Sequence, residues 1–213
     1  MDVFSRFEIT LDYPMRKPQL RLLPPRPTDA GPARPTLQTT GDDDEDVAGK
    51  GDVSTNSTKP TAKGPQDRYV APEMKDWTPI YRVGHQLMIL TMLNNGPHKL
   101  FILDTGAFST TISPEVAREV TKVHSNDNIK VRGLSGQVSS VYTAESITFR
   151  FANVSQNVRD VVAFDSPSIS KSTGLEIAGF IGYTALAQMT IGIDYRDGLM
   201  KFSYDPNRGF HPQ

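Results

Sequence analysis

The sequence of 213 residues contains no cysteine, which excludes disulfide bonds, a cysteine nucleophile and thiolate metal ligands. No apolar run approaches the roughly 20 residues that a membrane-spanning helix needs. The formal net charge is -1, so no basic excess is available to attract nucleic acid or an anionic membrane. The first residues lack a basic segment followed by an apolar one, so no signal peptide is expected, and the compartment stays open. The four histidines have no metal-ligand spacing, and the sequence predicts neither a metal nor a cofactor.

Apolar residues make up 37% of the chain, a low share for a protein that is compact throughout. Between Pro24 and Lys75 the residues are mainly proline, glycine, serine, threonine and charged types, with an acidic run at residues 42–46. Such a segment buries too little apolar surface to offset the loss of chain entropy on folding. We therefore expect a short segment at 1–23, a disordered linker at 24–75 and a folded domain at 76–213.

The folded domain has β patterns almost throughout. Residues 86–93 and 99–103 are apolar runs on either side of the turn signal Asn94-Asn95-Gly96. Residues 147–151 alternate between apolar and polar types, the period of a half-buried strand. One short helix is expected from Ser113-Pro114 to about Val123, with serine as its N-cap. Many short strands with little helix predict an all-β fold, a small closed β-barrel.

Two motifs in this domain stand out. The apolar run at 100–103 leads directly into Asp104-Thr105-Gly106-Ala107. A charged side chain at the end of a buried strand is costly to desolvate unless it is hydrogen-bonded, paired or used. Gly106 permits a tight turn there, and the Thr105 hydroxyl can tie the loop down. The second motif, Phe180-Ile181-Gly182, follows about 75 residues later.

Together these motifs resemble the catalytic Asp-Thr-Gly-Ala loop and the hydrophobic-hydrophobic-glycine element of the retropepsin-like aspartic proteases. The resemblance covers about residues 77–204 and implies a retropepsin-like closed barrel. It implies that Asp104 is the catalytic carboxylate, that Thr105, Gly106 and Ala107 support its loop, and that Phe180, Ile181 and Gly182 pass beneath it. It also implies a flap over the substrate, which we assign to Gly133, Leu134, Ser135 and Gly136 because glycines at a hairpin tip permit an opening motion.

The function implied is that of an aspartic-type endopeptidase acting on a peptide or protein substrate. That chemistry needs two carboxylates, and the chain has a single Asp-Thr-Gly. The second aspartate would come from a homodimer or from a tandem domain of the same polypeptide. The alternative is a non-catalytic peptide-binding or dimerisation module with the same fold. Asp194, in the last predicted hairpin, is expected to be structural rather than catalytic.

The amino-terminal segment resembles the end of the chain. Residues 4–13 align without a gap with residues 186–195 and share Ile9, Asp12 and Tyr13 with them. Residues 20–22 correspond to residues 200–202 if the first turn is two residues longer. This internal repeat predicts that residues 1–23 are the tail of a preceding similar domain. The alternative is an accessory hairpin, and either is too small to form a core alone, so we expect it to be partly disordered or loosely docked.

Overall fold

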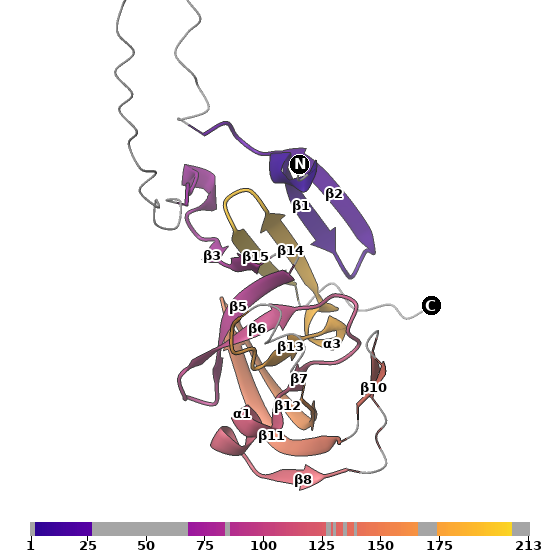
Figure 1. Ribbon diagram of the computed structural model, residues 1–213. Helices are drawn as coiled ribbons and strands as arrows, with labels where there is room; N and C mark the ends of the chain where they lie inside the picture. Colours follow the sequence, from indigo (N-terminus) through magenta and orange to yellow (C-terminus); the bar gives the residue numbers. More distant parts are fainter. Residues whose placement is uncertain are drawn as a thin grey trace, which may run out of the picture.

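The computed structural model describes residues 3–26, 68–83, 86–126, 129, 131–133, 136–138, 140–165 and 174–205 (Figure 1). Most of these residues are in β-strands. Two short α-helices, α1 (Pro114–Val120) and α3 (Tyr183–Leu186), and two 3-10 helices, η1 (Val3–Arg6) and η3 (Pro72–Met74), complete the described elements. None of the described helices has the length and apolar character needed to cross a membrane.

Six strands close into a barrel. They follow one another around it in the order β5, β6, β13, β7, β12 and β11, and β11 pairs back onto β5. Their bounds are β5 (Gln86–Leu93), β6 (His98–Leu103), β7 (Thr111–Ile112), β11 (Tyr142–Phe151), β12 (Val154–Ala163) and β13 (Gly179–Ile181). The pairs β6–β13 and β7–β12 are parallel, whereas the other neighbours are antiparallel. This closed barrel confirms the predicted fold class.

Smaller strands extend the barrel sheet. β4 (Tyr81–Val83) pairs with β5, and β8 (Val123–Ser125) pairs with β11. β9 (Arg132–Gly133) and β10 (Gly136–Gln137) form a separate two-stranded hairpin.

The barrel interior is filled as the alternating pattern predicts. Ile147, Phe149 and Phe151 on β11 are all buried, and Phe149 packs edge-to-face on Phe101 of β6 with ring centroids 5.7 Å apart. Edge-to-face packing is a favoured geometry for aromatic pairs. The core therefore lies directly behind β6, the strand that leads into Asp104.

Helix α1 begins as predicted and ends earlier. The Ser113 side chain accepts a hydrogen bond from the Val116 N–H at 3.3 Å, so serine is the N-cap and Pro114 takes the first helical position. The helix ends at Val120 because Thr121 has an extended backbone and the chain then enters β8. The expected end near Val123 is therefore about three residues too late, and Val123 is the first residue of β8.

A second sheet of five strands covers one end of the barrel. Its order is β2 (Lys17–Leu22), β1 (Phe7–Asp12), β14 (Met189–Asp194), β15 (Leu199–Tyr204) and β3 (Thr78–Pro79). In Figure 1 the indigo hairpin β1–β2 lies alongside β14, above the barrel. β1 pairs with β14 over five positions, and Ile9 is buried in the main core. The amino-terminal hairpin is therefore docked by a continuous ladder, which corrects the expectation of loose docking.

The two hairpins of this sheet have turns of equal length. β1 and β2 are separated by residues 13–16, and β14 and β15 by residues 195–198. The expectation of a longer first turn is therefore wrong, and Leu20 corresponds to Phe202 rather than to Met200.

The expected linker at 24–75 overlaps the described residues at both ends. Ala71 and Met74 are buried in a small second cluster with Leu23 and Leu199. The folded part therefore begins no later than Arg68, earlier than the expected Asp76. Residues 27–67 lie outside the described part of the chain.

Candidate active site

Asp104 follows the last residue of β6, at the end of the barrel that faces the second sheet. Its backbone N–H donates to the carbonyl oxygen of Ile181 at 3.0 Å. Its side-chain oxygen Oδ1 accepts hydrogen bonds from the N–H groups of Gly106 at 2.9 Å and Ala107 at 3.2 Å. Two main-chain donors on one oxygen fix the carboxylate orientation and provide the partners that a half-buried charge requires.

The predicted element at 180–182 lies directly against this loop. β13 runs parallel to β6, with Phe180 opposite Ile102 and Ile181 opposite Leu103. The Gly182 N–H donates to the Thr110 hydroxyl at 3.3 Å. The structure thus brings the Asp104 loop and the 180–182 motif together, although they are far apart in sequence.

The first turn of α3 also holds the loop. The Tyr183 N–H donates to the Ala107 carbonyl at 2.7 Å, and the Thr184 N–H donates to the Phe108 carbonyl at 2.9 Å. N–H groups at a helix start have no intrahelical partner and are available for such bonds. The loop is therefore fixed from β13, from Thr110 and from α3.

A cavity of about 370 Å³ opens beside Asp104 and Thr105. Its walls are mostly apolar and come from the barrel and from the second sheet, including Leu87, Ile193 and Tyr195. Asp104 is the only acidic side chain among the described residues that line it. Among the described residues, the cavity thus contains a single carboxylate, that of Asp104.

Tyr13, at the start of the β1–β2 turn, reaches this loop from the amino-terminal hairpin. Its hydroxyl is hydrogen-bonded to the Thr105 side chain, and burial raises the pKa of the Tyr13 phenol. Its ring lies 5.8 Å from that of Tyr183. No sequence motif marks Tyr13 as a site residue; its alignment with Tyr195 is the signal that could have found it.

The predicted flap is only partly described. Gly133 pairs with Gly136 across the β9–β10 hairpin. Leu134 and Ser135, the two residues expected at the tip, lie outside the described residues. The role of this hairpin as a flap stays a prediction.

Asp194 has a structural environment. It is fully buried at the end of β14, and its Oδ1 accepts a hydrogen bond from the Asp197 N–H at 3.0 Å, which closes the β14–β15 turn. Burial is the main cause that raises the pKa of the Asp194 carboxyl, and the charge of Asp197 adds to it. Asp194 is absent from the lining of the Asp104 cavity.

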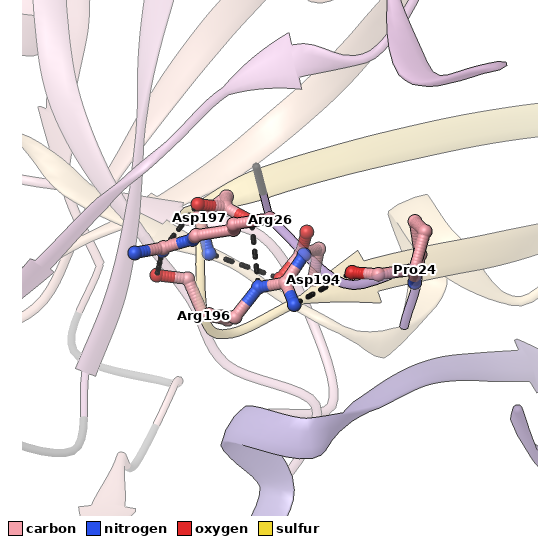
Figure 2. Close-up of polar contacts among 5 residues, drawn as sticks. All are labelled: Pro24, Arg26, Asp194, Arg196 and Asp197. Atoms are coloured by element: carbon pink, nitrogen blue, oxygen red, sulfur yellow. Dashed lines mark hydrogen bonds and ion pairs between the residues drawn. The ribbon is translucent and has the colours of Figure 1, made fainter. Parts of the chain in front are cut away.

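Asp197 lies in a cluster that joins the two hairpins (Figure 2). It is paired with Arg26 and, at 2.9 Å, with Arg196. Arg196 also donates to the Pro24 carbonyl at 2.8 Å. The chain segment after β2 is therefore attached to the β14–β15 turn. Within the described residues there is no group of three or more acidic or histidine side chains that could hold a metal ion.

Comparison with known proteins agrees with these motifs. Residues 90–185 match the family described as aspartyl protease, a stretch that contains both the Asp104 loop and the 180–182 element. This match supports a retropepsin-like aspartic protease domain in that part of the chain. Among solved structures it is similar to an EIAV protease complexed with the inhibitor HBY-793, with 15% identity, a TM-score of 0.37, and coverage of 50% of this chain and 89% of that chain. No curated protein matches the chain.

Proposed function

We propose that this domain is one half of an aspartic-type endopeptidase, with Asp104 as one of the two catalytic aspartates. The observation that carries the proposal is the position of Asp104, whose Oδ1 is held by two main-chain N–H groups at the edge of a largely apolar cavity. In the described part of the chain no hydrogen bond reaches its other oxygen, Oδ2. That oxygen is available to a water molecule.

The reaction divides two tasks between two carboxylates. The ionised one accepts a proton from water as the water oxygen attacks the scissile carbonyl carbon, and the protonated one donates its proton to the carbonyl oxygen. The C–N bond then breaks and a proton passes to the leaving amine. Two carboxylates at close range do not both ionise easily, so they titrate as a pair. Asp104 alone cannot perform both tasks, and a homodimer or a tandem domain would supply the second aspartate.

The remaining site residues have supporting roles in this proposal. Thr105, Gly106 and Ala107 hold the loop, and Phe180, Ile181 and Gly182 fix it from below. The hairpin tip at 133–136 would close over an extended peptide or protein substrate and exclude water from the reaction.

Replacement of Asp104 by asparagine tests the proposal. Asparagine keeps an oxygen acceptor for the Gly106 and Ala107 N–H groups, so the variant should fold normally, but it cannot hold the shared proton. Peptide products from an unbiased peptide mixture at mildly acidic pH, identified by mass spectrometry, should disappear. The matched control is Asp160→Asn, at an exposed residue of β12 with φ of 51°, a conformation that asparagine tolerates well. Equal cleavage by Asp104→Asn and by the parent chain would refute the assignment.

A non-catalytic module is the second candidate, since one carboxylate lines the described cavity. A cleft of this kind can bind an extended peptide without cutting it. Peptide binding with no cleavage, under conditions where two copies of the domain are associated, would favour this candidate. Inhibition of cleavage by a statine-type transition-state mimic would favour the enzyme.

A further inference from the structure

The two hairpins of the second sheet are copies of one unit. Each residue of β1–β2 corresponds to the residue 182 positions later, because β1 begins at Phe7 and β14 at Met189, and all four strands have six residues. The turns match as well. Asp12 accepts a hydrogen bond from the Met15 N–H at 3.1 Å, as Asp194 does from the Asp197 N–H at 3.0 Å.

The backbone conformation of the turns repeats too. Arg16 has φ of 53° and its counterpart Gly198 has φ of 64°. A left-handed conformation at an arginine is uncommon, so the turn geometry, rather than the residue type, is what the two hairpins share.

The two copies are related by a local two-fold axis. β1 and β14 pair in an antiparallel register centred on Thr10 opposite Gly192. At one end of the ladder Glu8 lies opposite Asp194, and at the other end their counterparts Thr190 and Asp12 lie opposite each other. The sheet order β2-β1-β14-β15 has the same symmetry.

The symmetry ends at the surface that the hairpins cover. Phe202 on β15 is 3% exposed and packs edge-to-face on Phe151 of the barrel, with ring centroids 5.4 Å apart. Its counterpart Leu20 on β2 lies on the same face of the sheet and is 57% exposed. The β1–β2 hairpin thus exposes an apolar side chain at the position where the β14–β15 hairpin packs on the barrel. Applied to this barrel, the two-fold axis places a second barrel of the same type over the exposed Leu20.

The tyrosines show where the active-site loop of such a lobe would lie. The ring of Tyr13 from the first hairpin lies 5.8 Å from that of Tyr183, whose N–H holds the Ala107 carbonyl of the Asp104 loop, and its hydroxyl bonds Thr105 of the same loop. The two-fold axis therefore places its counterpart Tyr195 beside the equivalent threonine of the second barrel. Tyr195 already lines the cavity that contains Asp104.

We propose that β1–β2 is the closing hairpin of a second retropepsin-like lobe of the same polypeptide, and that Tyr13 and Tyr195 are positioning residues that each hold the active-site loop of the opposite lobe. That the second lobe supplies the second aspartate rests on the proposed function, whereas the arrangement of the two lobes does not. The partner it fits is a barrel with a hydroxyl residue after its own aspartate, docked on Leu20 across the Thr10–Gly192 axis.

The first test uses the full chain and amide hydrogen exchange, measured by NMR. Tyr13→Phe removes the hydroxyl that holds Thr105, so the Gly106 and Ala107 amides should exchange about fivefold faster or more, while the Ile147 amide in the core is unchanged. The control, Tyr204→Phe, removes a hydroxyl from a residue that is 59% exposed on β15 and should alter neither loop amide. Unchanged loop amides in Tyr13→Phe would overturn the positioning role.

The second test builds the missing lobe. In a chimera, a second copy of residues 68–185 is fused directly before Phe4. The added barrel then has residues 4–22 as its closing hairpin, in the place that residues 186–204 take in the original domain. Because the chain has no cysteine, Leu20→Cys introduces a unique thiol. Its modification by a maleimide should be about tenfold slower or more in the chimera than in the chain alone, because a buried thiol is inert. Gln19→Cys, on the opposite face of β2, should react equally fast in both proteins.

A second fusion controls for folding of the added barrel. It places residues 68–204 before Phe4, so the added barrel keeps a hairpin of its own and Leu20→Cys should stay reactive. If this fusion folds and the chimera does not, or if the thiol is equally reactive in both, the assignment of β1–β2 is wrong. Protection of Leu20→Cys in the unfused chain that rises with protein concentration would also overturn it, since the occupant is then a second copy. Neither test measures cleavage, so failure of the proposed function would leave these results unaffected.

Discussion

Gly182 lies directly against the backbone of Ser109. A Cβ atom at Gly182 would be 2.4 Å from the Ser109 carbonyl oxygen and 2.9 Å from that of Ala107. Both contacts are with backbone of the Asp104 loop, which cannot move aside as a side chain could. A residue without a side chain is therefore required where the 180–182 element passes under the loop.

Gly182→Ala should accordingly lower the free energy of unfolding by about 2 kcal/mol or more, as overpacking against fixed backbone does. Gly106→Ala is the comparison, since a Cβ there would meet only the Asp104 Oδ1 atom, at 3.2 Å. We expect a clearly smaller loss for this variant. Denaturant unfolding of the two variants and the parent chain measures the difference, and equal losses would contradict the close approach at Gly182.

The barrel could be predicted because its local signals agree with its packing. The run at 86–93 is exactly β5, and Ser113 caps α1 as its position before Pro114 indicated. The Asp104 loop and the 180–182 element could be paired in advance only through the resemblance to a known family. Neither motif by itself indicates a parallel pairing between β6 and β13.

The parts that could not be predicted depend on contacts between distant segments. The composition of residues 24–75 predicts a linker that includes Met74, yet Met74 is buried against Leu23 and Leu199. The hydrogen bond between Tyr13 and Thr105 joins residues that no local pattern connects. The docking of β1 on β14 is set by matching apolar faces, a property of the pair rather than of either strand.

Asp194 should make stability depend on pH. Burial raises its pKa in the folded state above the unfolded value, so the folded protein holds a proton that the unfolded chain releases. The free energy of unfolding should therefore fall as the pH rises from about 4, the ordinary carboxyl value, through the raised pKa of the folded state. Below about pH 4 this loss is absent, because Asp194 is protonated in both states.

Asp194→Asn isolates this effect. Asparagine keeps the oxygen that accepts the Asp197 N–H and has no charge to desolvate. The fall in unfolding free energy above about pH 4 should therefore be smaller in this variant, whereas Asp160→Asn should follow the parent chain. Denaturant titrations at a series of pH values provide the measurement. An identical pH dependence in Asp194→Asn and the parent chain would show that the raised pKa does not contribute.

The cluster around Asp197 should matter more for stability than an exposed ion pair in the same sheet. The Asp197 side chain is 1% exposed and lies between Arg26 and Arg196. Asp197→Ala leaves two guanidinium groups without their shared carboxylate, which typically costs about 3 kcal/mol when a buried pair is broken.

The control is Arg21→Ala, which breaks an ion pair with Glu8 in which the arginine is 70% exposed. Because such surface pairs contribute at most about 1 kcal/mol, the Arg21 variant should unfold near the parent midpoint. High salt should weaken the small Arg21 effect further and leave most of the Asp197 effect in place, since screening acts mainly on exposed charges. A loss for Asp197→Ala no larger than that for Arg21→Ala would mean that the cluster does not hold the segment after β2 to the β14–β15 turn.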